Sequence, residues 1–180
     1  MKQYKGAIFD LDGTLLDSMR VWDDIDVAFL KKRGLEVPPD YQEAITPLGF
    51  LEAARYTIRR FGFPETPEEL IREWHQMAVD AYTYEVELKD GAAEYLRYLK
   101  EKGIRMAVAT SSSPELYEPA LKRKGIYEYF KAFVTVSEVK RGKGFPDIYE
   151  KAAEKLSLPP ETCVVYEAVS YTHLRAHETS

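Results

Sequence analysis

The chain has 180 residues, of which 45% are hydrophobic and 31% charged, and it carries a net charge of −5. This composition is typical of a globular domain and excludes extensive disorder. The acidic balance argues against a nucleic-acid partner, no apolar run is long enough to span a membrane, and one cysteine cannot form an internal disulfide. Because the N-terminus also lacks a signal-peptide pattern, we expect a soluble, cytoplasmic protein. We also expect it to be a monomer.

Four short apolar runs predict the strands of a parallel sheet. Continuous apolar runs of this length are typical of strands that are buried on both faces. They lie at residues 6–10, 105–110, 132–136 and 163–167. Helical patterns lie at residues 91–102, 114–124 and 146–156. This alternation predicts right-handed βαβ units, and therefore a Rossmann-like α/β fold with helices on both faces of the sheet.

Residues 18–89 have a different pattern, with no strand signal and with helical stretches interrupted by glycine and proline. We interpret them as a small all-helical domain inserted into a core domain of residues 1–17 and 90–167. A long helix is expected from Pro67, with His75 at its surface or in its packing. Three aromatic residues of that helix are expected to pack the inserted domain: Trp74, Tyr82 and Tyr84.

The first predicted strand ends in AIFDLDGTLLDS, which contains Asp10 and Asp12. Residues two apart on an extended segment point to the same side, so both carboxylates can face one site beyond the carboxyl end of the strand. Two neighbouring carboxylates repel each other unless a cation lies between them, and oxygen ligands favour Mg²⁺. Taken alone, however, such a pair is more often a turn that caps a helix.

The other strand ends carry residues that suit a phosphate group. Thr110 and Ser111 follow the second strand and offer hydroxyl and backbone N–H donors. Lys143 follows the third strand and could neutralise a transferred phosphoryl group, and Glu167 ends the fourth. Each has a simpler alternative, such as a helix cap or a surface lysine. Together the four strand ends favour a metal-assisted phosphoryl-transfer site.

The segments FDLDGTLLDS, AVATSSS and GKGFPDIY resemble the first three motifs of the haloacid dehalogenase superfamily of phosphohydrolases. The insertion after the first motif resembles the helical cap of the phosphatase and β-phosphoglucomutase branch. The resemblance implies that Asp10 is the nucleophile that forms an aspartyl-phosphate and that Asp12 is the general acid and base. It further implies that Thr110 and Lys143 hold the phosphoryl oxygens. Mg²⁺ would bind the Asp10 carboxylate, the Asp12 backbone carbonyl and an acidic pair that begins at Glu167.

The cap sequence favours a hydrolase of small phosphomonoesters, with sugar phosphates as one option. Mutase-like relatives carry a His where this chain has Trp22, and an Arg in a segment where this chain offers Gly49 and Phe50. A β-phosphoglucomutase-like phosphomutase is therefore the alternative. Trp22 and Phe50 are candidates to line the substrate pocket, although aromatic residues in a helical cap more often form its core.

The C-terminal residues do not continue the family pattern. The fourth motif normally continues Glu-Asp, whereas Ala168 follows Glu167, and VSYTHLRAHET resembles the translation of a sequencing-library adapter. We hypothesise that residues 168–180 are a non-native tail and that the last strand and helix of the core are absent. The strand that contains Cys163 would then be a bare apolar edge of the sheet, and the chain would be poorly soluble. It would also be nearly inactive as an enzyme. An inactive fragment or a binding-only module is therefore a further alternative. A metal pair of His173 and His177 on a helix is the weaker alternative.

Overall fold

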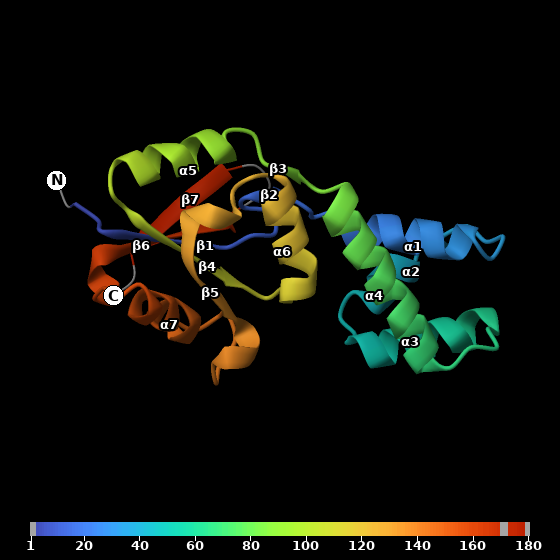
Figure 1. Cartoon of the computed structure of the whole chain (residues 1–180). Coiled ribbons are helices and arrows are strands. Elements are labelled where there is room, and N and C mark those ends of the chain that lie inside the picture. Colours follow the sequence, from blue (N-terminus) through green and yellow to red (C-terminus); the bar gives the residue numbers. More distant parts are fainter. Residues whose placement is uncertain (1–2, 170–172, 179–180) are drawn as a thin grey trace. The chain divides into compact units, whose positions relative to one another are not determined.

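The structure, a computed structural model, describes residues 3–169 and 173–178. The chain divides into two compact units, one of Met1–Met19 with Tyr82–Ser180 and the other of Arg20–Ala81. Residues 18, 19 and 82–89, which the sequence pattern placed in the insertion, lie in the first unit. The expected Rossmann-like α/β class is confirmed, because the first unit has a parallel sheet flanked by helices (Figure 1).

The sheet of the first unit has the strand order β5-β4-β1-β6-β7. Its four parallel strands confirm the four apolar runs: β1 (Gly6–Phe9), β4 (Arg105–Thr110), β5 (Phe130–Thr135) and β6 (Cys163–Val169). Phe9, at the end of the central strand β1, is in register with Val108 on one side and Tyr166 on the other. The residues that follow β1 and β4 therefore emerge at the same edge of the sheet, beside the end of β6.

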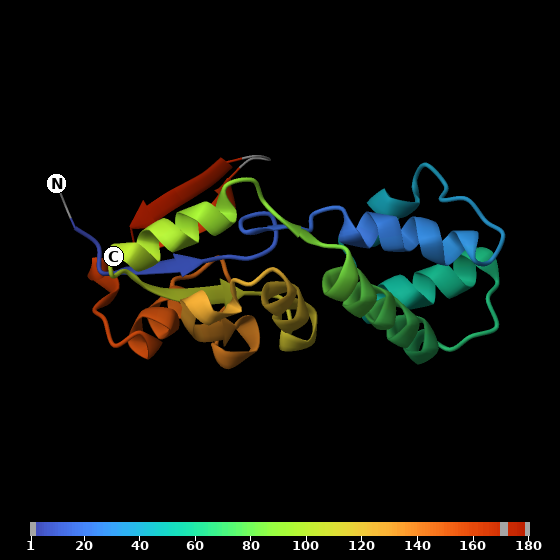
Figure 2. The same cartoon turned by 45° about the horizontal axis from the view of Figure 1, so that its top comes forward.

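Helices cover both faces of this sheet. They are α5 (Ala92–Glu101), α6 (Pro114–Arg123) and α7 (Asp147–Lys155), joined by the short 3₁₀ helices η1 (Tyr127–Tyr129), η2 (Val136–Glu138) and η3 (Pro160–Thr162). Figure 2 shows α5 and α7 on opposite sides of the sheet. The opposite faces follow from the topology, because the right-handed connections through α5 and α7 run in opposite directions along the sheet.

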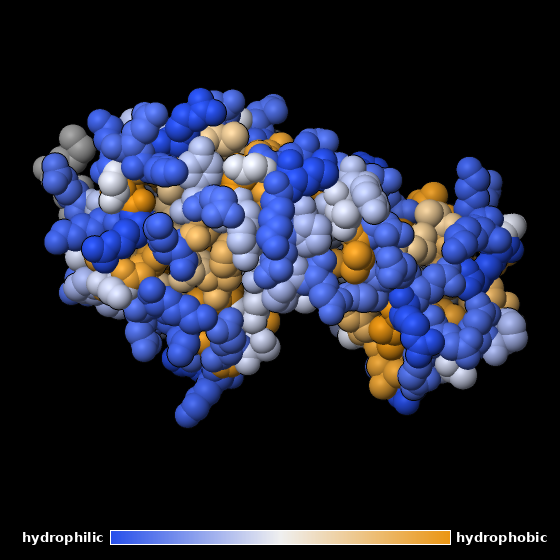
Figure 3. Space-filling view, viewed as in Figure 1, coloured by the Kyte–Doolittle hydropathy of each residue, from blue (hydrophilic) through white to orange (hydrophobic). Residues whose placement is uncertain are grey.

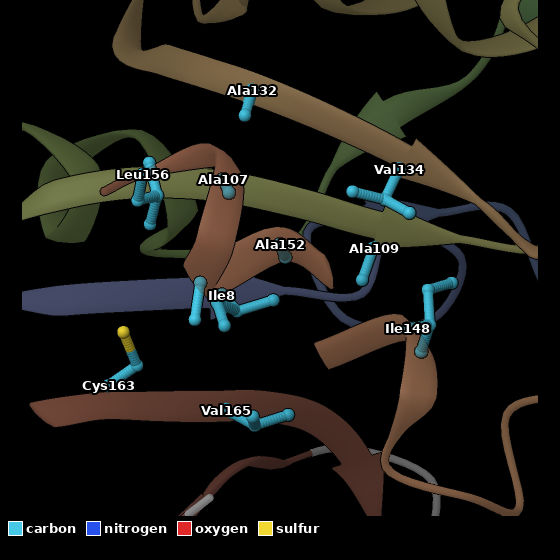
Figure 4. Packing of buried hydrophobic residues seen from close by; sticks show 11 residues of the cluster. Ile8, Ala107, Ala109, Ala132, Val134, Ile148, Ala152, Leu156, Cys163 and Val165 are labelled. Carbon is cyan, nitrogen blue, oxygen red and sulfur yellow. The ribbon is translucent and has the colours of Figure 1, made fainter. Parts of the chain in front are cut away.

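The core lies between the sheet and α7. Ile148 and Ala152 of α7 pack against Ile8 in the central strand, in a cluster of small and branched apolar residues (Figure 4). Cys163 belongs to this cluster and is fully buried, as expected for a thiol within an apolar strand. Strand residues alternate between the faces, so Phe133 points away from this cluster and stacks on Tyr117 of α6.

A short antiparallel ribbon joins the places where the chain leaves and re-enters the first unit. It consists of β2 (Leu16–Asp17) and β3 (Glu87–Leu88), and the Lys89 N–H donates to the Leu15 carbonyl at 2.8 Å. The expectation that residues 18–89 contain no strand is therefore wrong at β3. Strands of two residues are too short to produce an alternating pattern, so the sequence gives no signal for them.

Strand β6 is not a bare edge, contrary to expectation. The backbone of β7 (His173–Glu178) pairs with it in antiparallel register, from Val164 with Glu178 to Val169 with His173. The unpaired N–H and C=O groups of an edge strand can bind any extended segment, whatever its side chains. A helical pair of His173 and His177 is also wrong, because both lie on this strand. The proposed origin of the tail stays a prediction, and its residues 170–172 and 179–180 lie outside the described residues.

The second unit is helical over its described length, as expected for the insertion. It contains α1 (Val21–Lys31), α2 (Tyr41–Ile45), α3 (Phe50–Phe61) and most of α4 (Pro67–Tyr84). Helix α3 ends at Gly62, whose φ of 72° is easily reached only by glycine. The Thr66 hydroxyl accepts the Glu69 N–H at 3.2 Å and so caps the start of α4.

The core of the second unit is aromatic. Phe29 of α1 contacts Trp74 of α4 and Phe63, with ring centroids 5.6 and 6.0 Å apart. The packing role expected for Trp74 is confirmed. The same expectation is wrong for Tyr82, which lies in the first unit, and for Tyr84, which is 73% exposed. A helix that continues from one unit into the other changes its surroundings without a change in its sequence pattern.

The face seen in Figure 3 is mainly hydrophilic, with smaller hydrophobic areas between the charged residues. This mixture matches the large share of charged residues in the sequence. Within residues 3–169 and 173–178, no helix combines the length and the apolar character that crossing a membrane requires.

Candidate active site

Asp10 lies directly after the central strand β1. Its backbone N–H donates to the Tyr166 carbonyl at 3.0 Å, which ties it to the end of β6. Lys143 donates from Nζ to Asp10 Oδ1 at 2.5 Å. Burial raises the pKa of Asp10 above its ordinary value, and the Lys143 ammonium opposes this rise. Lys143 therefore favours the ionised form of the Asp10 carboxylate, whereas burial favours the protonated form.

The loop after Asp10 fixes the position of Asp12. The Leu11 carbonyl accepts the N–H groups of Thr14, Leu15 and Leu16 at 2.9–3.0 Å. Gly13, inside this tight loop, has a φ of 79°, which other residues adopt only at a cost. The glycine of the predicted motif is thus required by the backbone conformation that turns the chain between Asp12 and β2.

Three hydroxyl groups contact the Asp12 carboxylate. Ser18 and Tyr82 each donate to Oδ1 at 2.6 Å, and Ser112 donates to Oδ2 at 2.5 Å. The sequence predicted a role in the site for none of the three, and it predicted for Tyr82 a packing role in the inserted domain. Ser18 and Ser112 lie within or beside the quoted motifs, so the motifs were a signal for both. Tyr82 lies 70 residues from Asp12 and no local pattern connects them.

Thr110 and Lys143, the predicted phosphate-binding residues, also reach this end of the sheet. Thr110 is the last residue of β4 and is buried, and its hydroxyl accepts the Ser112 N–H at 3.0 Å. Ser111, between them, is exposed. The loop that carries Lys143 is anchored by Arg141, which donates to Asp147 of α7 at 2.6 Å. The structure thus brings Asp10 and Lys143 into contact and connects Asp12 to Thr110 through Ser112.

Tyr149 connects Glu167 with the surroundings of Asp10. The Tyr149 hydroxyl donates to Glu167 Oε2 at 3.3 Å. Burial, followed by the charges of Glu167 and Asp10, raises the pKa of this phenol, so both carboxylates act on the same hydroxyl. Over the described part of the chain, no three His, Cys, Asp or Glu side chains are close enough to hold a metal ion. The predicted set of magnesium ligands contains only two such side chains, Asp10 and Glu167, and its third donor is the Asp12 backbone carbonyl. All three donors are hard oxygen atoms, which suit Mg²⁺.

The second unit contains a cavity of about 360 Å³. It is lined by both predicted pocket residues together with four from α4: Trp22, Phe50, Glu68, Ile71, Arg72 and His75. The ring centroids of Trp22 and Phe50 are 5.3 Å apart, and the residues are 37% and 56% exposed. They are therefore not core residues of the cap, and the cavity wall is mainly apolar with charged groups on one helix.

Residues 4–167 match the haloacid dehalogenase-like hydrolases. The chain belongs to this family. Hexitol phosphatase A of Escherichia coli is 32% identical over 91% of this chain and 74% of its own length. The phosphorylated carbohydrates phosphatase of Thermotoga maritima is 26% identical over 91% of this chain and 76% of its own length.

Solved structures show the same fold. A candidate β-phosphoglucomutase of Thermotoga maritima has a TM-score of 0.82 and 25% identity, and the match covers 95% of this chain and 78% of that one. The family and its phosphatase relatives establish that the chain is a hydrolase of the haloacid dehalogenase type, in the branch that contains phosphatases and phosphomutases.

Proposed function

We propose that this hydrolase releases phosphate from a small phosphomonoester, with Asp10 as nucleophile, Asp12 as general acid and base, and Mg²⁺ as cofactor. The observation that carries the proposal is the contact between the partly buried Asp10 carboxylate and Lys143. A carboxylate kept ionised inside the protein is a suitable nucleophile, and the same ammonium can neutralise an incoming phosphate.

The reaction follows from the two carboxylates. An oxygen of Asp10 attacks phosphorus while the P–O bond to the organic group breaks, and a protonated Asp12 gives its proton to the departing oxygen. Water then attacks the phosphorus of the aspartyl-phosphate, the bond to Asp10 breaks, and the Asp12 carboxylate takes the proton from that water. Each turnover consumes one water and returns both side chains to their initial states.

The groups around Asp10 would hold the phosphoryl oxygens and the cation. Thr110 and Lys143 would bind the phosphoryl oxygens, with Ser111 offering a further donor at the same strand end. Mg²⁺ would be held by the carboxylates of Asp10 and Glu167 and by the Asp12 carbonyl. When bound, it would neutralise the negative charge of the phosphate and the carboxylates.

The cavity of the second unit supports a role for Trp22 and Phe50 in binding the organic group of the substrate. Relatives of this chain include phosphatases of hexitols and of phosphorylated carbohydrates, and we propose a small organic phosphate of this kind as substrate. The fold likeness to a candidate β-phosphoglucomutase keeps a phosphomutase as the second candidate function.

Asp10→Asn tests the mechanism. Phosphate release from a panel of phosphomonoesters with Mg²⁺ should fall at least about 1,000-fold, because the amide is not a competent nucleophile. The exposed Asp24 provides a matched control, and Asp24→Asn should behave as the wild type. Wild-type turnover by Asp10→Asn would refute the covalent mechanism.

The product formed by the wild type distinguishes the two candidate functions. Transient sugar bisphosphate without net phosphate release would identify a mutase instead of a hydrolase.

A further inference from the structure

The hydrogen bonds of Asp12 differ between its two oxygens. Among the described residues, Oδ1 accepts from both Ser18 and Tyr82, whereas Oδ2 accepts only from Ser112. Each oxygen of a carboxylate has two lone-pair sites. Oδ1 is therefore filled, and Oδ2 has one site left for a further hydrogen-bond partner.

The two donors to Oδ1 stand where the chain passes between the compact units. Ser18 comes two residues before the second unit begins at Arg20, and Tyr82 is the first residue after it ends at Ala81. Tyr82 is only 3% exposed, so its hydroxyl has little access to water as an alternative partner. A tyrosine hydroxyl is protonated at neutral pH, so Tyr82 can act as a donor to Asp12.

We propose that Tyr82 is a positioning residue that, with Ser18, anchors Oδ1 of Asp12 so that Oδ2 is the oxygen that exchanges a proton with the substrate. The inference rests on the proposed role of Asp12 as general acid and base. Ser112, which donates to Oδ2, is also hydrogen-bonded through its backbone to Thr110, a proposed phosphate ligand. Oδ2 is thus the oxygen that the contacts connect to the phosphate-binding strand end.

Removing the Tyr82 hydroxyl would leave the oxygen it contacts with one donor and allow the carboxylate to rotate. Proton transfer would then become less efficient, while the nucleophile Asp10 and its partner Lys143 keep their contact. The loss should depend on the leaving group, because a nitrophenolate departs without a proton and an alkoxide does not.

The experiment compares Tyr82→Phe with the wild type on phosphomonoesters whose leaving groups range from nitrophenol to simple alcohols. The readout is kcat/KM, which contains the steps up to release of the leaving group and not the later hydrolysis of the aspartyl-phosphate. We expect about a tenfold loss of kcat/KM on alkyl phosphates and less than a twofold loss on nitrophenyl phosphate, a part of the 10²–10⁴-fold that a general acid supplies. Tyr84→Phe, an exposed tyrosine on the same helix, is the matched control and should change neither rate. An equal loss on both substrates, or no loss, would overturn the inference.

Asp12→Asn separates this inference from the proposed function on which it rests. In the Asp12→Asn background, Tyr82→Phe should add no further loss on alkyl phosphates, since its effect passes through Asp12. A full additional loss there would overturn the positioning role and leave the function intact. If Asp12→Asn alone lowered kcat/KM by the same factor on both classes of substrate, the general-acid assignment itself would fail, and the inference with it.

Discussion

Single residues in this hydrolase have properties that their neighbours determine. Asp10 is a partly buried carboxylate next to an ammonium, and its pKa reflects the balance between burial, which raises it, and Lys143, which lowers it. Glu167 and Tyr149 form a second polar contact near the same carboxylate. The reactivity of the site is therefore set by pairs of residues that come from different strand ends.

Lys143→Met should move the acidic limb of the pH–rate profile to higher pH. Without the ammonium, the effect of burial on Asp10 is opposed only by the hydrogen bond from the Leu11 backbone. The pKa of Asp10 then rises further, and the nucleophilic carboxylate is lost at a higher pH than in the wild type. Loss of the phosphate contact should also lower kcat/KM about 100-fold at the optimum. The measurement is kcat/KM between pH 4 and 9.

Lys140, exposed in the same loop, provides the control for this prediction. Lys140→Met should keep both the rate and the acidic limb of the wild type. An unchanged limb in Lys143→Met would contradict the electrostatic role of the lysine, even if the rate fell, because a phosphate contact alone does not alter the ionisation of Asp10 in the free enzyme.

At the scale of elements, the contact between helices α1 and α2 includes a carboxyl group with a raised pKa, that of Asp26. Burial raises the pKa of Asp26 in α1 to about 6, although its hydrogen bond with Gln42 in α2 opposes the rise. The folded state therefore binds a proton more tightly than the unfolded chain does. The free energy of unfolding should fall as the pH rises from about 4 towards 6, and it should stay lower above that range.

Asp26→Asn should remove the loss of stability that the ionised Asp26 causes above about pH 6. We expect the variant to be about 1 kcal/mol more stable than the wild type at pH 7.5, a value reduced by the solvent screening of a partly exposed group. Near pH 4 the difference should vanish, because Asp26 is largely protonated in the folded state. Urea unfolding at both pH values measures it. Asp24→Asn, at an exposed site of the same helix, should show no such gain, and an equal gain from it would contradict the explanation.

For the whole molecule, the division into two units separates the phosphate chemistry from the aromatic cavity. Asp10, Asp12, Thr110 and Lys143 belong to the first unit, whereas the cavity of Trp22 and Phe50 belongs to the second. In our proposal one unit supplies the reaction and the other the preference among organic groups. Substitutions in the cavity should therefore change which substrates are preferred rather than the chemical step.

Trp22→Ala should raise KM about tenfold for phosphomonoesters with bulky organic groups, the equivalent of about 1.4 kcal/mol of lost apolar contact. For the smallest alkyl phosphate, KM should stay within about twofold of the wild type. Val27→Ala, an exposed substitution on the same helix, is the control. Equal effects of Trp22→Ala on large and small substrates would remove the cavity from the proposed substrate site.

The order of the elements and the chemistry at the strand ends could be predicted from the sequence. Continuous apolar runs specify buried strands, and the carboxyl ends of parallel strands meet at one edge, so Asp10 and Lys143 come together although 133 residues separate them. Residue identity and local periodicity were sufficient, because Asp10 directly follows β1 and Lys143 lies in the loop between β5 and α7, and the sheet fixes where both strands end.

The tertiary structure alone revealed the surroundings of Asp12 and the edge of the sheet. Tyr82 has the helical pattern of a cap residue, yet it donates to Asp12, and β7 pairs with β6 although its sequence has no strand motif. Such contacts depend on where distant segments finally lie, and on backbone groups that every residue carries. Periodicity reports the face that a residue buries, whereas the partner it meets there is decided by the packing of the whole unit.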